Sequence, residues 1–226
     1  MKPVLLCVVA LAFFTSAVPS AASQGSVDHE RGKVALLDTT DFAEARRVSD
    51  WIVATNDSVN QPFMVVDKAN ARLFLFDAAG KLRATTPVLL GLARGDDSPP
   101  EIGTRKLSEI APQERITPAG RFVAQIGQDL DGSQILWIDY DTAIALHRAS
   151  DRKPGLSSKS RLARLSSATP AEKRVSLGCI NVSGTFYERF IQPTFATTNG
   201  IAYILPETRS ADDQFGITSR DVSASS

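Results

Sequence analysis

Short apolar segments separated by turn residues follow Pro62, and this alternation restricts the fold more than any other feature of the chain. Each segment has the length and the aliphatic or aromatic content of a β-strand. Lys68-Ala69-Asn70 and Ala78-Ala79-Gly80-Lys81 are typical of hairpin turns, which predicts an antiparallel meander at the start. We therefore expect a mainly β domain with a few helices. The predicted strands are residues 63–67, 72–77, 82–90, 121–126, 134–140, 142–146 and 201–205.

Other patterns set the limits of this domain. Between Asp41 and Thr55, apolar and small residues recur on one helical face, which predicts an N-terminal packing helix within residues 23–61. The strands place the folded unit at residues 62–206, and the long loop 91–118 is expected to border a cleft. Residues 207–226 are polar, Ser-rich and aperiodic, and we expect a disordered tail.

The N-terminus has the pattern of an export signal. Lys2 precedes the apolar run Val4–Phe14, and Ser20 and Ala22 are the small residues of a cleavage site. This run is shorter than the roughly 20 residues of a spanning helix. Residues 1–22 are thus predicted to be a signal peptide that leaves no stable membrane anchor, and the mature protein is predicted in the periplasm or cell envelope.

Charge and composition exclude several partners. The 25 basic and 25 acidic residues cancel, which gives no indication of nucleic-acid binding. The chain has only two cysteines, Cys7 and Cys179, and two histidines, His29 and His147, and these are scattered, so we expect no metal and no cofactor. Removal of the signal leaves Cys179 as a single thiol in an oxidising compartment, where cysteines usually pair.

Two segments have the composition of a catalytic thiol site. His147 ends the apolar strand Ala143–Leu146, and Cys179 lies in a small-residue turn between Val175 and Val182. Gly178 can adopt backbone angles closed to other residues, so the amides of Gly178 and Cys179 are predicted to form an oxyanion hole. A helix over 183–191 is predicted to follow, capped by Ser183. A nearby imidazole would lower the thiol pKa. The alternative is a structural cysteine and a core histidine.

These residues resemble the L,D-transpeptidase (YkuD-like) catalytic domain family. His147 matches its upstream histidine, and Ser176, Gly178, Cys179, Ile180 and Asn181 match its terminal block. Val66-Asp67 with Arg72–Phe76 and Thr117–Phe122 are similar to two further family segments. The resemblance covers about residues 62–206 and implies a YkuD-like β-sandwich or mixed-sheet domain. Leu177 departs from the family, because it stands where the family has a second histidine, and 32 positions from His147 to Cys179 is a long interval.

The resemblance implies peptidoglycan stem peptides as partners. Cys179 would form a thioester after attack on a stem-peptide carbonyl, and His147 would act as base and acid. Ser176 either orients His147 or satisfies the loop. The acceptor stays open between a stem amine, a protein lysine and water, which give 3→3 cross-linking, protein anchoring or carboxypeptidase activity.

Residues 148–174 hold eight basic and two acidic side chains, which indicates either a basic lid over the cleft or a solvated insertion. Arg174 is predicted to bind a substrate carboxylate. Arg148 and Asn181 complete the predicted substrate-binding set, and the Asn181 amide is also expected to hold the turn.

Three alternatives compete with this interpretation. A sortase-like enzyme also has His before Cys, but its thiol does not follow a glycine. Papain-like wall peptidases place Cys before His, which is the reverse order. The third is a non-catalytic cell-envelope module that binds peptidoglycan, and Leu177 favours it most.

Overall fold

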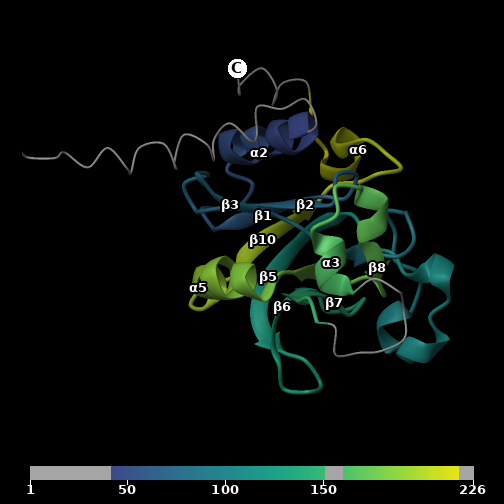
Figure 1. Cartoon of the computed structure of the whole chain (residues 1–226). Helices are drawn as coiled ribbons and strands as arrows, with labels where there is room; N and C mark the ends of the chain where they lie inside the picture. The colour runs from purple at the N-terminus through teal and green to yellow at the C-terminus, as the bar shows by residue number, and fades with distance from the viewer. Residues whose placement is uncertain (1–41, 151–159, 219–226) are drawn as a thin grey trace, which may run out of the picture.

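The computed structural model describes residues 42–150 and 160–218 (Figure 1). An eight-stranded mixed sheet has the order β3-β2-β1-β10-β5-β6-β7-β9, and β4 pairs with β8 in a small second sheet. β1 with β10 and β7 with β9 are parallel pairs. The strands are β1 (Phe63–Asp67), β2 (Arg72–Phe76), β3 (Leu82–Pro87), β4 (Leu90–Gly91), β5 (Gly120–Gln128), β6 (Gln134–Asp139), β7 (Ile144–Arg148), β8 (Arg174–Ser176), β9 (Ile180–Val182) and β10 (Gly200–Ile204).

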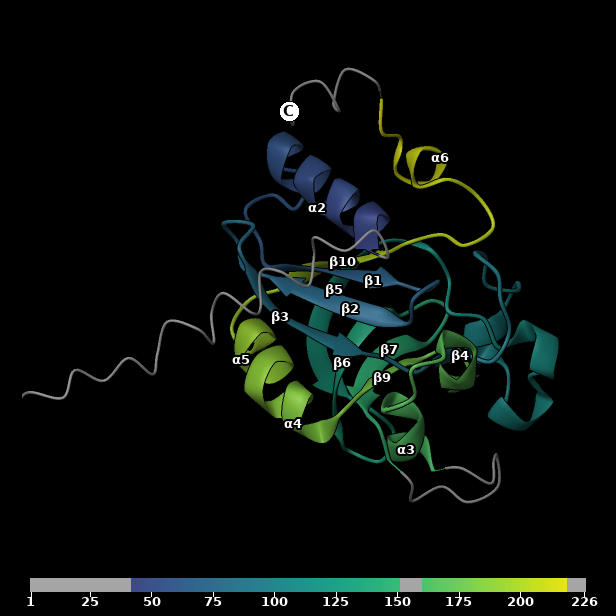
Figure 2. The same ribbon diagram turned by 45° about the horizontal axis from the view of Figure 1, so that its top comes forward.

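Helices cover both faces of the β1–β2–β10 part of the sheet (Figures 1 and 2). On one face lies α2 (Ala43–Thr55), and on the other lies a continuous helical segment. This segment begins at the predicted cap Ser183, whose Oγ accepts the N–H of Phe186 at 3.1 Å. It consists of α4 (Gly184–Phe186), a π-helical turn (Tyr187–Ile191) and α5 (Gln192–Phe195).

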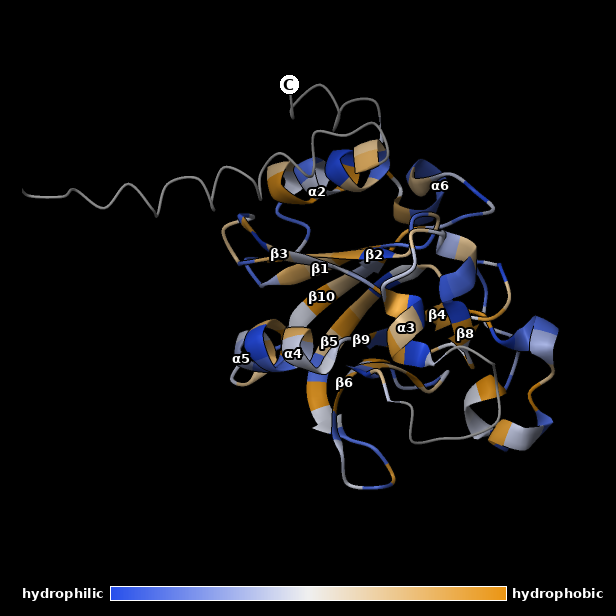
Figure 3. Cartoon of the chain, viewed as in Figure 1, coloured by the Kyte–Doolittle hydropathy of each residue, from blue (hydrophilic) through white to orange (hydrophobic). Residues whose placement is uncertain are grey.

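Two buried clusters follow from these layers. Phe63 and Val65 of β1 pack toward α2, whereas Met64 and Val66 pack in the larger cluster on the opposite face. Every residue of β1 is buried, because side chains alternate between two covered faces. Figure 3 shows the hydrophobic residues along these strands. The prediction of a mainly β mixed-sheet domain with an N-terminal helix is confirmed.

The segment after β10 differs from the expected tail. Residues 207–218 include α6 (Ala211–Phe215), and Ala211 and Ile217 are buried against α2 and the sheet. The Glu207 side chain is 4% exposed. The prediction of disorder is wrong for this part, because its few apolar and acidic groups have partners far away in the sequence. Residues 219–226 lie outside the described residues, as do residues 1–41 with the predicted export signal.

The loop before β5 contains three 3₁₀ turns, Ile102–Thr104, Leu107–Glu109 and Pro112–Glu114. A fourth, Pro170–Lys173, precedes β8, and the short helix α3 (Arg161–Leu165) comes before it. Within residues 42–150 and 160–218, none of the helices has the length and apolar character needed to cross a membrane.

Candidate active site

His147 and Cys179 reach one pocket because β7 and β9 are neighbouring parallel strands. The register pairs Leu146 with Ile180 and His147 with Asn181. Cys179 directly precedes β9. It lies two positions before Asn181, so the two side chains are on the same side of the strand, as those of Ala145 and His147 are in β7. Both side chains line a pocket of about 930 Å³. The structure thus brings together the two residues that the sequence singled out.

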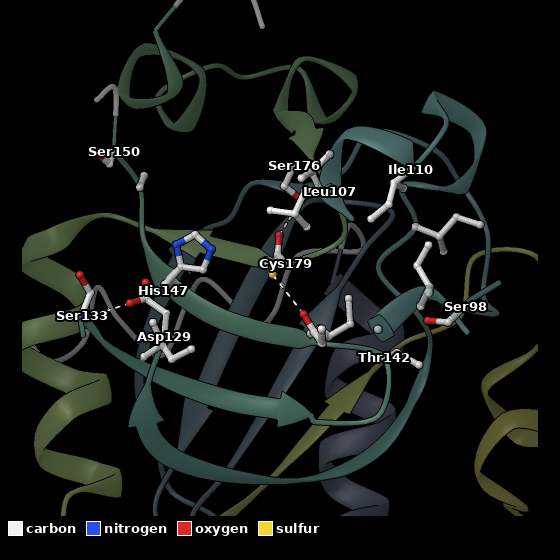
Figure 4. Close-up of a pocket in the computed structure, with 18 of the residues that line it drawn as sticks. Ser98, Leu107, Ile110, Asp129, Ser133, Thr142, His147, Ser150, Ser176 and Cys179 are labelled. Atoms are coloured by element: carbon white, nitrogen blue, oxygen red, sulfur yellow. Dashed lines mark hydrogen bonds between the residues drawn. The ribbon is translucent and has the colours of Figure 1, made fainter. Parts of the chain in front are cut away.

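The pocket has walls of different character. The loop before β5 supplies the apolar side chains Ile102, Leu107 and Ile110. This confirms the prediction that the long loop borders a cleft. The β5–β6 turn supplies polar groups that include Asp129 and Ser133. In Figure 4, Leu107 and Ile110 lie on one side of Cys179, and His147 lies on the other side with Asp129 and Ser133.

The turn before Cys179 requires glycine at position 178. The φ angle of Gly178 is 140°, and a Cβ there would come within 2.8 Å of the Ile116 carbonyl oxygen. The Gly178 N–H donates to Ser176 Oγ at 3.1 Å, and Ser176 Oγ donates to the Cys179 carbonyl at 2.6 Å. Ser176 therefore closes the turn, while the predicted oxyanion role of the Gly178 N–H is wrong because that N–H is already bonded.

Thr117 holds this turn from a distant part of the chain. Its Oγ1 donates to the Gly178 carbonyl at 2.7 Å and accepts the Gly91 N–H at 2.8 Å. Sequence reasoning noted Thr117 only as part of a family segment and gave it no role. The Thr-Pro sequence was the signal that could have identified it.

Cys179 is half-buried, and its Sγ lies 3.7 Å from the Ala143 carbonyl oxygen. Among the side chains drawn in Figure 4, no hydrogen bond joins Sγ to the His147 ring. Burial raises the pKa of the thiol, and the Ala145 backbone, the Arg161 charge and the Cys179 N–H oppose this effect. The direction is the reverse of the one expected from a direct imidazole pair, because the effect of burial outweighs the groups that favour the thiolate.

The imidazole of His147 is held by its neighbours. Nδ1 lies 3.2 Å from the Arg148 carbonyl oxygen, which places a proton on Nδ1 and the lone pair on Nε2. Asn181 Nδ2 lies 3.1 Å from Nε2 and 3.5 Å from Nδ1. An atom almost equidistant from both ring nitrogens cannot lie in the ring plane without touching the carbon between them. The Asn181 amide therefore packs against the face of the ring, as a weak N–H···π contact.

Two of the predicted substrate-binding residues have internal partners instead. Arg174 is buried, and its guanidinium donates to Glu207 at 2.5 Å and to the Ala93 carbonyl at 3.2 Å. Asn181 is fully buried and contacts His147. These two predictions are wrong, because both side chains are committed within the fold.

Arg148 lines the pocket, as a substrate-binding residue should. It forms an ion pair with Glu188 at 3.3 Å, and its guanidinium stacks 4.1 Å from the Tyr187 ring. Its substrate-binding role stays a prediction.

The described residues of the basic segment 148–174 lie in different surroundings. Arg161 lines the pocket, whereas Lys173 is buried beside Arg174. Arg152, Lys153 and Lys159 lie outside the described residues. The interpretation of this segment as a lid therefore stays a prediction. Arg161 was counted only as part of the charge run, and no local signal distinguished it. In the described part of the chain, no group of three or more His, Cys, Asp or Glu residues could hold a metal ion.

Comparison with known proteins identifies the domain. The L,D-transpeptidase catalytic domain family, YkuD, matches residues 61–192, which is more than half of the chain. A solved structure of the catalytic domain from E. faecium L,D-transpeptidase is 15% identical, with a TM-score of 0.36 over 65% of this chain and 98% of that one. No curated protein matches the chain. On the extent of the family match, the chain belongs to the YkuD family of L,D-transpeptidase catalytic domains.

Proposed function

We propose that the chain is an exported, cysteine-dependent L,D-transpeptidase-like enzyme that acts on peptidoglycan stem peptides. The observation that carries this proposal is the convergence of the Cys179 thiol and the His147 imidazole in one pocket. Family membership supports the reaction class and the stem-peptide substrate. The N-terminal sequence supports export to the periplasm or cell envelope.

The reaction begins with attack of Cys179 Sγ on a stem-peptide carbonyl carbon. His147 Nε2 takes the thiol proton and returns it to the departing amine when the C–N bond breaks, which leaves a thioester. The backbone N–H groups of Ala145 and Cys179 favour negative charge on the sulfur, and such donors also suit the developing oxyanion. Attack by an acceptor amine or water then releases the thiol.

Substrate binding is the step that brings thiol and base together in this scheme. Catalytic hydrogen bonds are often loose in the unliganded protein and tighten when substrate binds. The raised pKa of the resting thiol favours proton transfer to His147 during attack over transfer before it.

The direct test is incubation with a disaccharide tetrapeptide followed by mass spectrometry. We expect loss of the terminal D-amino acid or formation of a cross-linked dimer, and neither product with Cys179→Ala. Unchanged tetrapeptide with a folded wild-type protein would contradict the proposal.

The second candidate is a non-catalytic envelope module. The raised thiol pKa and the Sγ contact with the Ala143 carbonyl favour it. It predicts saturable binding of the tetrapeptide, equal in wild type and Cys179→Ala, with no product in either.

A further inference from the structure

Arg161, the first residue of α3, contacts the nucleophile–base site from the long segment between His147 and Cys179. Its Nη1 donates to Asn181 Oδ1 at 3.1 Å, and its side chain lines the pocket. Arginine can only donate hydrogen bonds, so it fixes which end of the Asn181 amide is oxygen. The Nδ2 end is then directed at the His147 ring.

The position of Arg161 is fixed by the segment around it. Ser160 caps α3, with its Oγ accepting the Ala163 N–H at 3.1 Å. Arg164 Nη1 donates to the Glu172 carbonyl at 2.7 Å, and Ser167 Oγ donates to the Glu172 carboxylate at 2.8 Å. These bonds tie α3 to the turn that leads into β8, and hence to the chain that ends in Cys179.

We propose that Arg161 is a positioning residue that orients the Asn181 amide against the His147 ring and places a fixed cation beside Cys179. The inference rests on the proposed function only in taking Cys179 as the nucleophile. One side chain of the basic segment then has a role at the nucleophile–base site. This role differs from that of a lid over the cleft and from that of a solvated insertion. The Arg161 charge favours the thiolate, in opposition to burial.

Other charged and titratable groups also face this pocket and bear on any pH profile. Arg105 pairs with Glu114 at 2.9 Å, and Arg148 pairs with Glu188 at 3.3 Å, so each cation is offset by a carboxylate. Arg161 differs from these two in that it donates to a residue of the site itself, the Asn181 amide. The charged and titratable pocket residues are Arg105, Glu114, Asp129, Asp131, His147, Arg148 and Arg161.

The first experiment measures the rate of Cys179 alkylation by iodoacetamide against pH in the full chain. We expect Arg161→Gln to move the midpoint to higher pH and to slow labelling at pH 7 about threefold, since loss of a nearby cation raises a thiol pKa. Arg161→Lys should restore most of the rate. Arg189→Gln removes the same charge from an exposed position outside the pocket, and it should leave the midpoint unchanged.

The second experiment observes the His147 ring by ¹⁵N NMR, in a chain with only one other histidine, His29. Wild type should show the Nδ1–H tautomer set by the Arg148 carbonyl, and Arg161→Gln should shift the ring ¹⁵N resonances, because the Asn181 amide loses its orientation against the ring face. Asn181→Ala should do the same, and the double variant should add nothing, because both side chains act in one chain of contacts. Arg161→Met replaces Arg161→Gln if the latter does not fold.

The outcomes separate this inference from the proposed function. An alkylation midpoint and His147 ring ¹⁵N resonances that are the same in folded Arg161→Gln and Arg189→Gln would overturn the role of Arg161 and leave Cys179 as nucleophile. A Cys179 that resists alkylation at every pH in the folded wild type would overturn both.

Discussion

Two regions of the molecule hold charged groups at buried or half-buried positions, and the surroundings of these charges differ between the two regions. One is the pocket around Cys179. The other is the buried ion cluster of Lys68, Asp96, Arg174 and Glu207, whose side chains are each at most 8% exposed. The cluster joins the β1–β2 turn, the loop after β4, β8 and the C-terminal segment.

Every charge in the buried ion cluster has a partner. Lys68 Nζ donates to Asp96 at 2.8 Å, to the Gly95 carbonyl at 2.6 Å and to the Thr117 carbonyl at 3.0 Å. Asp96 also accepts the backbone N–H groups of Glu207 and Thr208, each at 2.8 Å. Buried charges are tolerated when they are paired and hydrogen-bonded in this way.

The pocket is built differently around its reactive atom. Cys179 is half-buried with its Sγ 3.7 Å from the Ala143 carbonyl oxygen, and Arg161 donates to the neutral Asn181 amide beside it. The comparison shows that proximity to the cysteine in sequence does not make a charge part of the site. Arg174, five positions before Cys179, completes the buried ion cluster, whereas Arg161, farther away in sequence, contacts the site.

The largest effect is expected from His147→Ala, which removes the base from the pocket. Turnover of tetrapeptide should fall by about 10²- to 10⁴-fold, with thermal unfolding close to that of wild type. His29→Ala is the matched control, and it should retain full turnover. Equal turnover in both variants would remove His147 from the mechanism.

Arg174→Ala tests the buried ion cluster. It leaves Glu207 buried without its main counter-charge, and we expect the free energy of unfolding in urea to fall by about 3–5 kcal/mol. Arg83→Ala breaks an exposed pair with Asp77 and should cost at most about 1 kcal/mol. A raised KM with unchanged stability in Arg174→Ala would restore the predicted substrate-binding role.

The pH dependence of stability tests the same cluster through Asp96. Burial acts to raise the pKa of Asp96, but hydrogen bonds from Lys68, Thr208 and the backbone outweigh it and hold the pKa well below its usual range. A carboxylate with a depressed folded pKa stabilises the fold above its unfolded pKa and loses this contribution as pH falls through the folded value. Stability should therefore decline below about pH 4, by on the order of 2 kcal/mol.

Asp96→Asn provides the control for this titration. It should be less stable than wild type at neutral pH, because Lys68 loses its nearer counter-charge and keeps only Glu207 at 3.9 Å, and its stability should depend less on pH below 4. An equally steep acid decline in wild type and Asp96→Asn would assign the titration to other carboxylates.

The smallest effect is expected from Thr117→Val, which removes the hydrogen bond to the Gly178 carbonyl. Unfolding free energy should fall by about 1 kcal/mol, and Cys179 alkylation should change because the turn loosens. Thr104→Val, at an exposed hydroxyl that bonds the Glu101 carbonyl, should change neither. Identical alkylation in wild type and Thr117→Val would show that the turn does not need this bond.

Local patterns predicted much of the fold. The apolar run 63–67 gave β1 with the bounds observed, and Ser183 caps the helix that was expected to follow it. In contrast, β8 and β9 have three residues each, which is too short for the alternation of inward and outward side chains to be recognised in the sequence. They form because β4 and β7 provide edges for parallel pairing.

Only the site residues of a rare type, cysteine and histidine, could be identified from the sequence. The one cysteine outside the predicted export signal and a histidine at a strand end identified Cys179 and His147. The partners of Asp96 lie 111 and 112 positions away, at Glu207 and Thr208, and no sequence period relates groups so distant. For the same reason the disordered-tail prediction failed, and Arg161 could not be told apart from its basic neighbours.

The account depends most on Cys179 being an accessible nucleophile in the folded protein. The most direct measurement is the intact mass of the folded chain after exposure to a carbapenem-type acylating probe. We predict one covalent adduct that maps to the peptide containing Cys179 and is absent from Cys179→Ala. A folded wild-type protein of unchanged mass, with a thiol that reacts only after unfolding, would contradict the account.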